Sequence, residues 1–210
     1  MSALRKLADL IKKPQLIPSN DKLNIGKRSY ISEKNKALLN PDFTNITDKY
    51  IKVSLELQRV FGLRREESLK IKPHLADKND TLQLQPSWCK GGRGRNIPIR
   101  TEEQRYWLEE AKAVVEHGHS LIPENKSYIK QRYIYDKQVQ LAGLKNLHGL
   151  RHTYAQSRYK EITGFDAPIV SGVPVKQLNA EQRQLDYQAR MIITEELGHS
   201  RRQIVKNYCG

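Results

Sequence analysis

Apolar residues recur at helical spacing along most of the chain, and they alternate with polar residues in one short stretch. Leu or Ile at positions 4, 7, 10 and 11 predicts an amphipathic helix that Pro14 ends, and the polar, basic residues up to about 45 are typical of a linker or arm. The same spacing predicts further helices over about 46–61, 64–72, 101–115, 126–142, 148–162, 180–197 and 201–207.

Strand-like alternation is confined to "TLQLQPSWCKGGRGRNIPI" at 81–99. Leu82 and Leu84 lie on one predicted strand, Ile97 and Ile99 on the other, and a glycine-rich turn joins them. The order is helices, one small antiparallel sheet, and more helices, rather than the βαβ alternation of a doubly wound fold. The sequence therefore predicts an α+β fold that is mainly α.

Charge narrows the class of partner. The chain has 37 Lys and Arg against 23 Asp and Glu, a formal net charge of +14, which favours a polyanionic partner over a merely soluble basic protein. No apolar run reaches the ~18 residues of a membrane span and no signal-peptide core follows the N-terminus, so we expect a cytoplasmic protein without a membrane partner. Cys89 and Cys209 lie far apart and predict free thiols rather than a metal site.

Four separated stretches carry the candidate chemistry. On a helix, His148 and Arg151 are three positions apart and point the same way, and His199 lies nine positions before Tyr208. The stretches are "GLRREESLKI" (62–71), "CKGGRGRNIPI" (89–99), "HGLRH" (148–152) and "LGHSRRQIVKNY" (197–208). In this order and spacing they resemble the catalytic domain of the tyrosine recombinases, the phage-integrase family, over about residues 45–208.

The resemblance implies site-specific recombination of double-stranded DNA, in which a phosphodiester is transferred to a tyrosine hydroxyl and back to a DNA hydroxyl. The pentacoordinate transition state gains negative charge, and two guanidinium groups can donate to it in parallel at any working pH. By resemblance Arg64 and Arg151 are these arginines, and Tyr208 is the nucleophile that forms a 3′-phosphotyrosyl bond. No ATP, metal or other cofactor is expected.

Further roles follow from the resemblance. His148 hydrogen-bonds the phosphate or assists proton transfer, and His199 donates a hydrogen bond to the phosphate. Lys90 matches the hairpin lysine that protonates the leaving 5′ oxygen, with a DNA-backbone contact as its alternative. His152 points about 100° away from Arg151 on the helix, so a structural or solvent role is expected for it.

Acidic and basic neighbours complete the candidate site. Glu67 matches the acidic position after the first arginine and is expected to orient the basic groups. The alternative for Arg64 is a surface salt bridge with Glu67, and Arg65 competes with it for the clamp role. Contacts with DNA are expected from Arg65, Arg93, Arg95, Arg201 and Arg202.

The sequence departs from the family pattern in two places. About forty-seven residues separate Arg151 from His199, and the excess at about 165–190 resembles an insertion in integrases of mobile elements, either a partner or DNA contact or an ornamental loop with a helix extension. Only about forty residues precede the catalytic region, where the family usually has a helical clamp domain, and the chain stops two residues after Tyr208. We therefore expect an N-terminal helix and basic arm at 1–44 and a catalytic domain at 45–210, with assembly into a tetramer on DNA left open.

Two other classes share part of this pattern. A type IB topoisomerase usually has lysine in place of the first histidine, so His148 argues against it. A non-catalytic or inactive DNA-binding relative is favoured by the short flanking regions but not by the full set of site residues. An RNA-binding protein is a more distant alternative, because no RNP-like aromatic motif is present.

Overall fold

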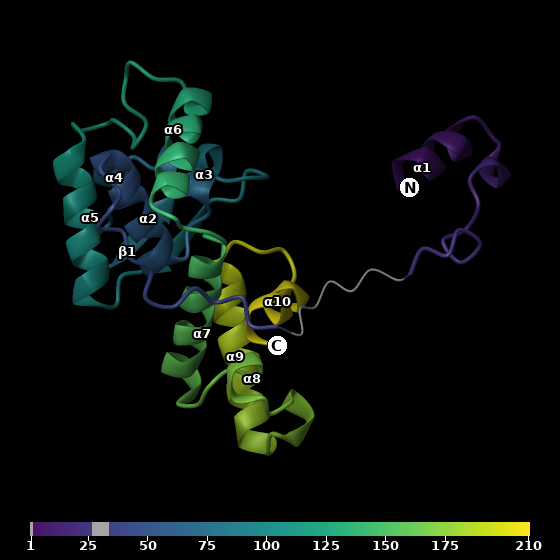
Figure 1. The fold of residues 1–210 in the computed structure, drawn as a ribbon. Helices are drawn as coiled ribbons and strands as arrows, with labels where there is room; N and C mark the ends of the chain where they lie inside the picture. The colour runs from purple at the N-terminus through teal and green to yellow at the C-terminus, as the bar shows by residue number, and fades with distance from the viewer. Residues whose placement is uncertain (1, 27–33) are drawn as a thin grey trace. The chain divides into compact units, whose positions relative to one another are not determined.

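The computed structural model describes residues 2–26 and 34–210, and the chain forms two compact units, Met1–Ser32 and Glu33–Gly210 (Figure 1). The first unit contains α1 (Ser2–Leu10) and the short 3₁₀ helix η1 (Pro14–Leu16). Ala8 of α1 is buried, whereas the predicted apolar positions are exposed. The amphipathic helix predicted before Pro14 is confirmed, and the part of the predicted arm at 27–33 lies outside the described residues.

Helix α2 (Lys49–Phe61) runs through the interior of the second unit. Asp48 caps its first turn, and Gly62, with φ of 62°, ends it. One apolar cluster packs on Val53, Leu57, Val60 and Phe61, and a second cluster packs on Ile51 and Leu55. A Cβ atom on Gly62 would lie 2.6 Å from Cδ1 of Tyr154, so glycine is needed both for the backbone angle and for the close approach.

The first half of the second unit surrounds this helix. Leu82 pairs with Ile97 in a two-stranded antiparallel sheet, which confirms the predicted hairpin. Thr101 caps the helix that follows, and this helix packs along α2. The elements are α3 (Arg65–Lys70), α4 (Pro73–Ala76), β1 (Thr81–Leu84), η2 (Pro86–Trp88), β2 (Arg95–Pro98) and α5 (Glu102–Val114). The unit is mainly helical with this small sheet, so the predicted α+β class is confirmed.

The second half is entirely helical within the described residues. Its elements are α6 (Tyr128–Leu141), α7 (Gly149–Thr163), α8 (Pro168–Ser171), η3 (Val175–Gln177), α9 (Ala180–Glu196), η4 (Arg202–Val205) and α10 (Lys206–Cys209). Helices α7 and α9 lie side by side, and α10 packs against α7 (Figure 1). The single helix predicted over 201–207 is η4 followed by one turn of α-helix.

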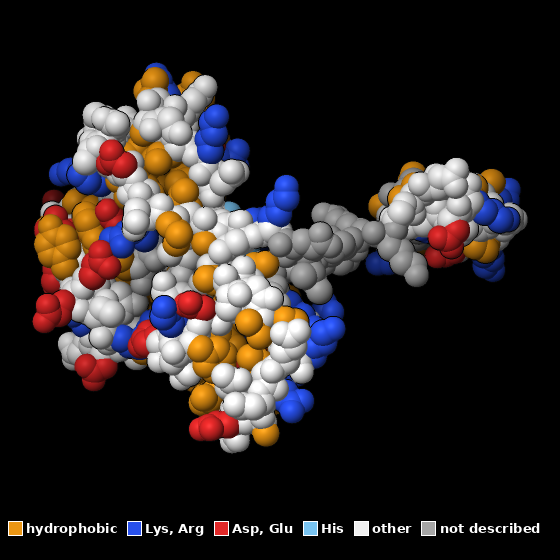
Figure 2. All heavy atoms as spheres, turned by 60° about the horizontal axis from the view of Figure 1, so that its bottom comes forward, with side chains coloured by type: hydrophobic (Ala, Val, Ile, Leu, Met, Phe, Trp, Pro, Cys, Tyr) orange, Lys and Arg blue, Asp and Glu red, His pale blue; other side chains and the backbone are white. Residues whose placement is uncertain are grey.

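The insertion at 165–190 forms α8, η3 and the first part of α9. Exposed apolar side chains gather at this end of the unit, including Val170, Val173 and Met191 (Figure 2). Within the described residues, no helix is both long and apolar enough to span a membrane.

The boundary between the two units lies earlier in the chain than the predicted position at 44. Phe43 and Ile46 are buried in the second apolar cluster, and the backbone N–H of Leu38 donates to the carbonyl of Gly149 at 3.2 Å. The final part of the predicted arm therefore belongs to the second unit.

Candidate active site

Arg151 joins three of the four motifs recognised in the sequence. Its side chain is 1% exposed in the first turn of α7, where Nη1 donates to the carbonyl of Gly62 and Nη2 to the carbonyl of Leu197. These two carbonyls follow α2 and α9, in the "GLRREESLKI" and "LGHSRRQIVKNY" stretches. Nη2 also lies 3.4 Å from Nε2 of His199, so the guanidinium connects the ends of two helices with two of the predicted site residues.

Tyr208, on α10, lies against this arginine. Its hydroxyl is 3.4 Å from Nε of Arg151, and the residue is only 5% exposed. The centroid of its ring lies 4.6 Å from that of His152, 5.6 Å from that of His199 and 6.1 Å from that of His148. His148, Arg151 and His199, which the spacing singled out, therefore lie around the predicted nucleophile. His148 and Arg151 are about fifty residues or more away from His199 and Tyr208 in the sequence, and the fold brings them together.

Glu67 is a buried anion shared by two arginines. Its carboxylate accepts hydrogen bonds from the backbone N–H of Arg64 at 2.8 Å and from Nη1 of Arg64 at 2.7 Å. Nη2 of Arg95 donates to it at 2.8 Å. Burial by itself raises the pKa of Glu67, but Arg95, then Arg151 and the Arg64 N–H group, outweigh that effect and lower it to about 2. The carboxylate is therefore ionised and fixes both guanidinium groups, the arrangement expected of a residue that orients the basic groups.

Arg95 does not occupy the surface position that was expected of a DNA contact. Its side chain is 6% exposed, it is paired with Glu67, and Nε donates to the carbonyl of Glu196 at 2.6 Å. The guanidinium connects β2, α3 and the end of α9, and a contact with DNA stays a prediction for this residue. Sequence reasoning missed this role, since an arginine in a glycine-rich turn is usually solvated.

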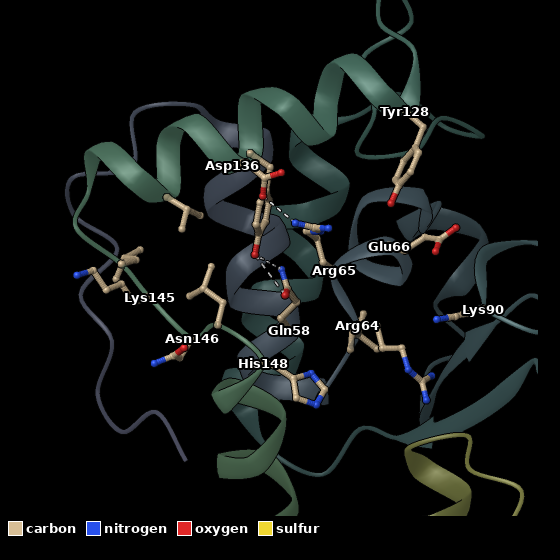
Figure 3. A pocket seen from close by; sticks show the side chains of 15 residues that line it. Gln58, Arg64, Arg65, Glu66, Lys90, Tyr128, Asp136, Lys145, Asn146 and His148 are labelled. Carbon is tan, nitrogen blue, oxygen red and sulfur yellow. Dashed lines mark hydrogen bonds and ion pairs between the residues drawn. The ribbon is translucent and has the colours of Figure 1, made fainter. Parts of the chain in front are cut away.

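A surface cavity of about 500 Å³ brings together Arg64, Lys90 and His148. In Figure 3 the Arg64 side chain lies between His148 on one side and Lys90 on the other. Lys90 is exposed in the turn that follows η2, and His148, at the N-cap of α7, is exposed as well. Tyr208 and His199 are not among the residues that line this cavity.

The other predicted DNA contacts keep surface positions. Nη1 of Arg65 pairs with Asp136 at 2.7 Å, and Arg65 lines the cavity together with Arg64. Arg93 and Arg201 are exposed. The guanidinium of Arg202 lies 4.4 Å from the ring centroid of Tyr187, a cation–π contact with the insertion.

The site combines fixed positive charge with neutral imidazoles. Burial lowers the pKa of Arg151 to about 10, which still leaves it protonated at neutral pH. Burial, followed by the charge of neighbouring cations, lowers the pKa of His152 to about 4 and that of His199 to about 3. Partial loss of solvation lowers the pKa of His148, and the positive charges of Arg151, Arg64 and Lys36 lower it further. In the described residues, no group of His, Cys, Asp and Glu could hold a metal ion.

Two residues in contact with Tyr208 were not predicted from the sequence to lie there. His152, for which a structural or solvent role was expected, is buried against the Tyr208 ring. Gln156, one turn further along α7, donates from Nε2 to the backbone carbonyl of Tyr208 at 2.9 Å. The spacing of His152 and Gln156 places them on one helix face, but which element covers that face depends on tertiary packing.

Residues 25–157 match the integrase family, which is more than half of the chain. The chain therefore belongs to this family, and the membership supports a general role in DNA integration or recombination, with DNA as the partner. The matched region contains Arg64, Lys90, His148 and Arg151, and it ends before His199 and Tyr208. No curated protein matches the chain.

Proposed function

We propose that this integrase is a tyrosine-type site-specific recombinase, which cleaves and rejoins DNA through a 3′-phosphotyrosyl intermediate on Tyr208. The observation that carries the proposal is the position of the Tyr208 hydroxyl, 3.4 Å from Nε of a buried arginine. Carbonyls from two other motifs fix that arginine, so its charge lies beside the Tyr208 hydroxyl before any DNA binds. Such preorganised donors are typical of sites that stabilise charge in a transition state.

The first step transfers the scissile phosphorus from DNA to the enzyme. Arg64 and Arg151 hold the non-bridging oxygens, and the Tyr208 oxygen attacks phosphorus as the bond to the 5′ oxygen breaks. We assign the phenolic proton to His148, which is neutral and exposed at the cavity. Lys90 donates a proton to the departing 5′ oxygen, which leaves as a hydroxyl.

The second step reverses the first on another strand. A 5′ hydroxyl attacks the phosphotyrosine, the new phosphodiester forms, and Tyr208 departs and recovers a proton. Because one ester replaces another, no external energy source is required. Preorganised donors such as Arg64 and Arg151 are commonly worth ~10²–10³ in rate for each group.

A covalent-trapping experiment tests the proposal. The probe is a pool of duplexes with one nick and randomised sequence around it, so that the short 5′ fragment diffuses away after cleavage and the protein–DNA adduct accumulates. The wild-type chain should form adducts that survive denaturant, and sequencing of the trapped DNA gives the preferred site. Tyr208→Phe should form none while keeping nearly full DNA affinity, because one hydroxyl contributes little beside the phosphate contacts.

Tyr106→Phe is the matched control, since Tyr106 is exposed on α5 and should not change trapping. Adducts that persist in Tyr208→Phe would refute the nucleophile. A wild-type chain that binds the pool without any adduct would favour a non-catalytic relative. Relaxation of a supercoiled plasmid without exchange between two duplexes would favour a topoisomerase.

A further inference from the structure

The chain enters the catalytic unit along residues 34–38, here called the strap. The strap lies on the N-terminal turns of α7, where Oγ1 of Thr153 donates to the carbonyl of Leu38 at 2.8 Å. A Cβ atom on Gly149 would lie 2.5 Å from the carbonyl oxygen of Lys36. Glycine at 149 therefore permits backbone to lie directly on backbone at this point, beside His148.

One buried side chain connects the strap with the helix that carries the nucleophile. Gln156 donates from Nε2 to Oδ1 of Asn35 at 2.8 Å and also to the carbonyl of Tyr208 at 2.9 Å. Its Oε1 accepts a hydrogen bond from Nδ2 of Asn35 at 3.3 Å. The amide of Gln156 thus bridges two segments that are far apart in the sequence.

Helix α10 depends on such contacts for its position. It is a single turn, Lys206–Cys209, without a side-chain cap, and helices this short are not stable by themselves. His152 contacts the ring of Tyr208, and Gln156 holds its backbone carbonyl from the same face of α7. The ring and the backbone of the nucleophile are therefore located by two residues one turn apart.

We propose that Gln156 is a positioning residue for Tyr208 and that Asn35 holds Gln156 in place, so that the seated strap sets where the nucleophilic hydroxyl lies. The inference rests on the proposed function, because it concerns the nucleophile of that reaction. A displacement of 1 Å in an attacking group can cost ~10² in rate, so loss of one bridging amide has a measurable effect on the chemical step.

Gln156→Met tests the bridge because it keeps the length and volume of the side chain but cannot donate. The duplex trapped in the experiment above is used at saturating protein, and the single-turnover rate of adduct formation is measured beside DNA affinity and the urea midpoint of unfolding. We expect adduct formation to slow by ~10-fold or more with affinity unchanged, as for loss of positioning. A packing role alone would leave the rate at saturation unchanged.

Gln131→Met is the matched control. Gln131 is fully buried on α6, and its amide has no hydrogen-bond partner within residues 2–26 and 34–210. The same substitution there removes no such contact and should leave the rate of adduct formation unchanged.

Asn35→Ala tests whether the strap affects the position of Tyr208. Because Asn35 is exposed, the substitution does not disturb the apolar core. We expect a several-fold slower single-turnover rate, and no additional slowing when Asn35→Ala is combined with Gln156→Met, since Asn35 acts through Gln156. Additive effects, or an unchanged rate in Asn35→Ala, would overturn the role of the strap.

The two proposals fail in different ways. An unchanged rate at saturation in Gln156→Met, while Tyr208→Phe forms no adduct, would overturn the positioning role and keep the nucleophile. A change in DNA affinity alone would also overturn it. Adducts in Tyr208→Phe would instead refute the nucleophile on which the inference rests.

Discussion

Arg151 and Lys90 both bring positive charge to the proposed reaction, but they are held in opposite ways. Arg151 is buried and tied to carbonyls at the ends of α2 and α9. Lys90 lies exposed in a turn where Gly91 and Gly92 have φ of 79° and 68°. A charge that must stay in place through the reaction is built into the core, whereas a group that must carry a proton to a leaving oxygen is placed on a backbone that can adjust.

The same contrast predicts how stability and rate separate between the two regions. Substitutions in the buried centre should affect both the free energy of unfolding and the rate of DNA cleavage. Substitution of Lys90 should affect the rate of cleavage and leave the free energy of unfolding nearly unchanged. The predictions below are arranged by their expected effect on the free energy of unfolding, from the largest to the smallest.

Glu67→Gln should give the largest loss. The substitution keeps the shape of the side chain but leaves the buried guanidinium of Arg95 without its anion, and breaking a buried pair costs about 3–5 kcal/mol. Urea unfolding at neutral pH measures the change. Glu66→Gln is the control: its ion pair with Lys70 is partly exposed, and we expect about 0.5 kcal/mol or less. Equal losses in the two variants would show that the buried cluster contributes no special stability.

Arg151→Lys should come next, with Arg64→Lys as its comparison. A lysine cannot serve the carbonyls of Gly62 and Leu197 together in the fixed geometry of a guanidinium, and each buried carbonyl left unpaired costs about 1–3 kcal/mol. Arg64 is partly exposed, so its substitution should cost less stability. Both variants should cleave DNA at least ~10²-fold more slowly in single-turnover assays. Near-normal rates in both would reduce the arginines to backbone contacts.

Lowering the pH should reduce the free energy of unfolding, because His152 and His199 are neutral in the folded chain. The pKa of His152 is about 4 and that of His199 about 3 in the folded chain, below the ordinary value near 6.5, so the unfolded chain binds more protons between these values. Their contribution is complete above pH 6.5 and declines as the pH falls towards 4 and 3. From pH 7.5 to 5.5 the free energy of unfolding should fall by about 1 kcal/mol for each histidine.

Urea titrations at the two pH values measure this slope. Glu67 does not contribute in this window, because its pKa lies near 2 when folded and its ordinary value is near 4.5. His152→Gln should remove part of the dependence on pH. A slope that is unchanged in this variant would assign the effect to other groups.

The sequence predicted the elements whose pattern is local and left undetermined those that depend on packing. The apolar spacing in 46–61 and the alternation around the glycine-rich turn gave α2 and the hairpin correctly, because buried faces repeat with the period of the element. The motifs included Arg151, His148 and His199, which lie around Tyr208, but they did not indicate His152 or Gln156 as its neighbours. The ion pair between Arg95 and Glu67 was not predicted, because Glu67 lies on α3 and nothing local to the turn indicates that contact.

Contacts made by segments without regular secondary structure could not be predicted from sequence patterns either. The strap has no periodic pattern of apolar residues. Its sequence therefore looks like that of a linker and does not indicate that it packs on Gly149. The helix predicted over 201–207 is instead the 3₁₀ helix η4 followed by α10. Packing of α10 against α7, which places Tyr208 there, is a tertiary contact that the local sequence pattern does not encode. Both features bear on the nucleophile, and both follow from tertiary contacts instead of local propensity.

Lys90→Gln should give the smallest change in stability and a large change in rate. Lys90 is exposed, so the free energy of unfolding should change by less than about 0.5 kcal/mol. Loss of a general acid should slow cleavage by ~10²-fold or more. Arg93→Gln, three residues further along the same exposed turn, is the matched control and should change DNA affinity and its salt dependence without a comparable loss of rate at saturation.

A sulfur substitution in the DNA separates the acid role of Lys90 from a contact with the backbone. Sulfur in place of the bridging 5′ oxygen at the trapped site gives a leaving thiolate, which needs no proton because a thiol is far more acidic than an alcohol. On this duplex Lys90→Gln should cleave nearly as fast as the wild-type chain, whereas Arg151→Lys should remain slow because its charge acts on the non-bridging oxygens. If sulfur rescues neither variant, Lys90 acts through binding or orientation, and the proton donor must be another group near the cavity that Lys90 shares with Arg64 and His148.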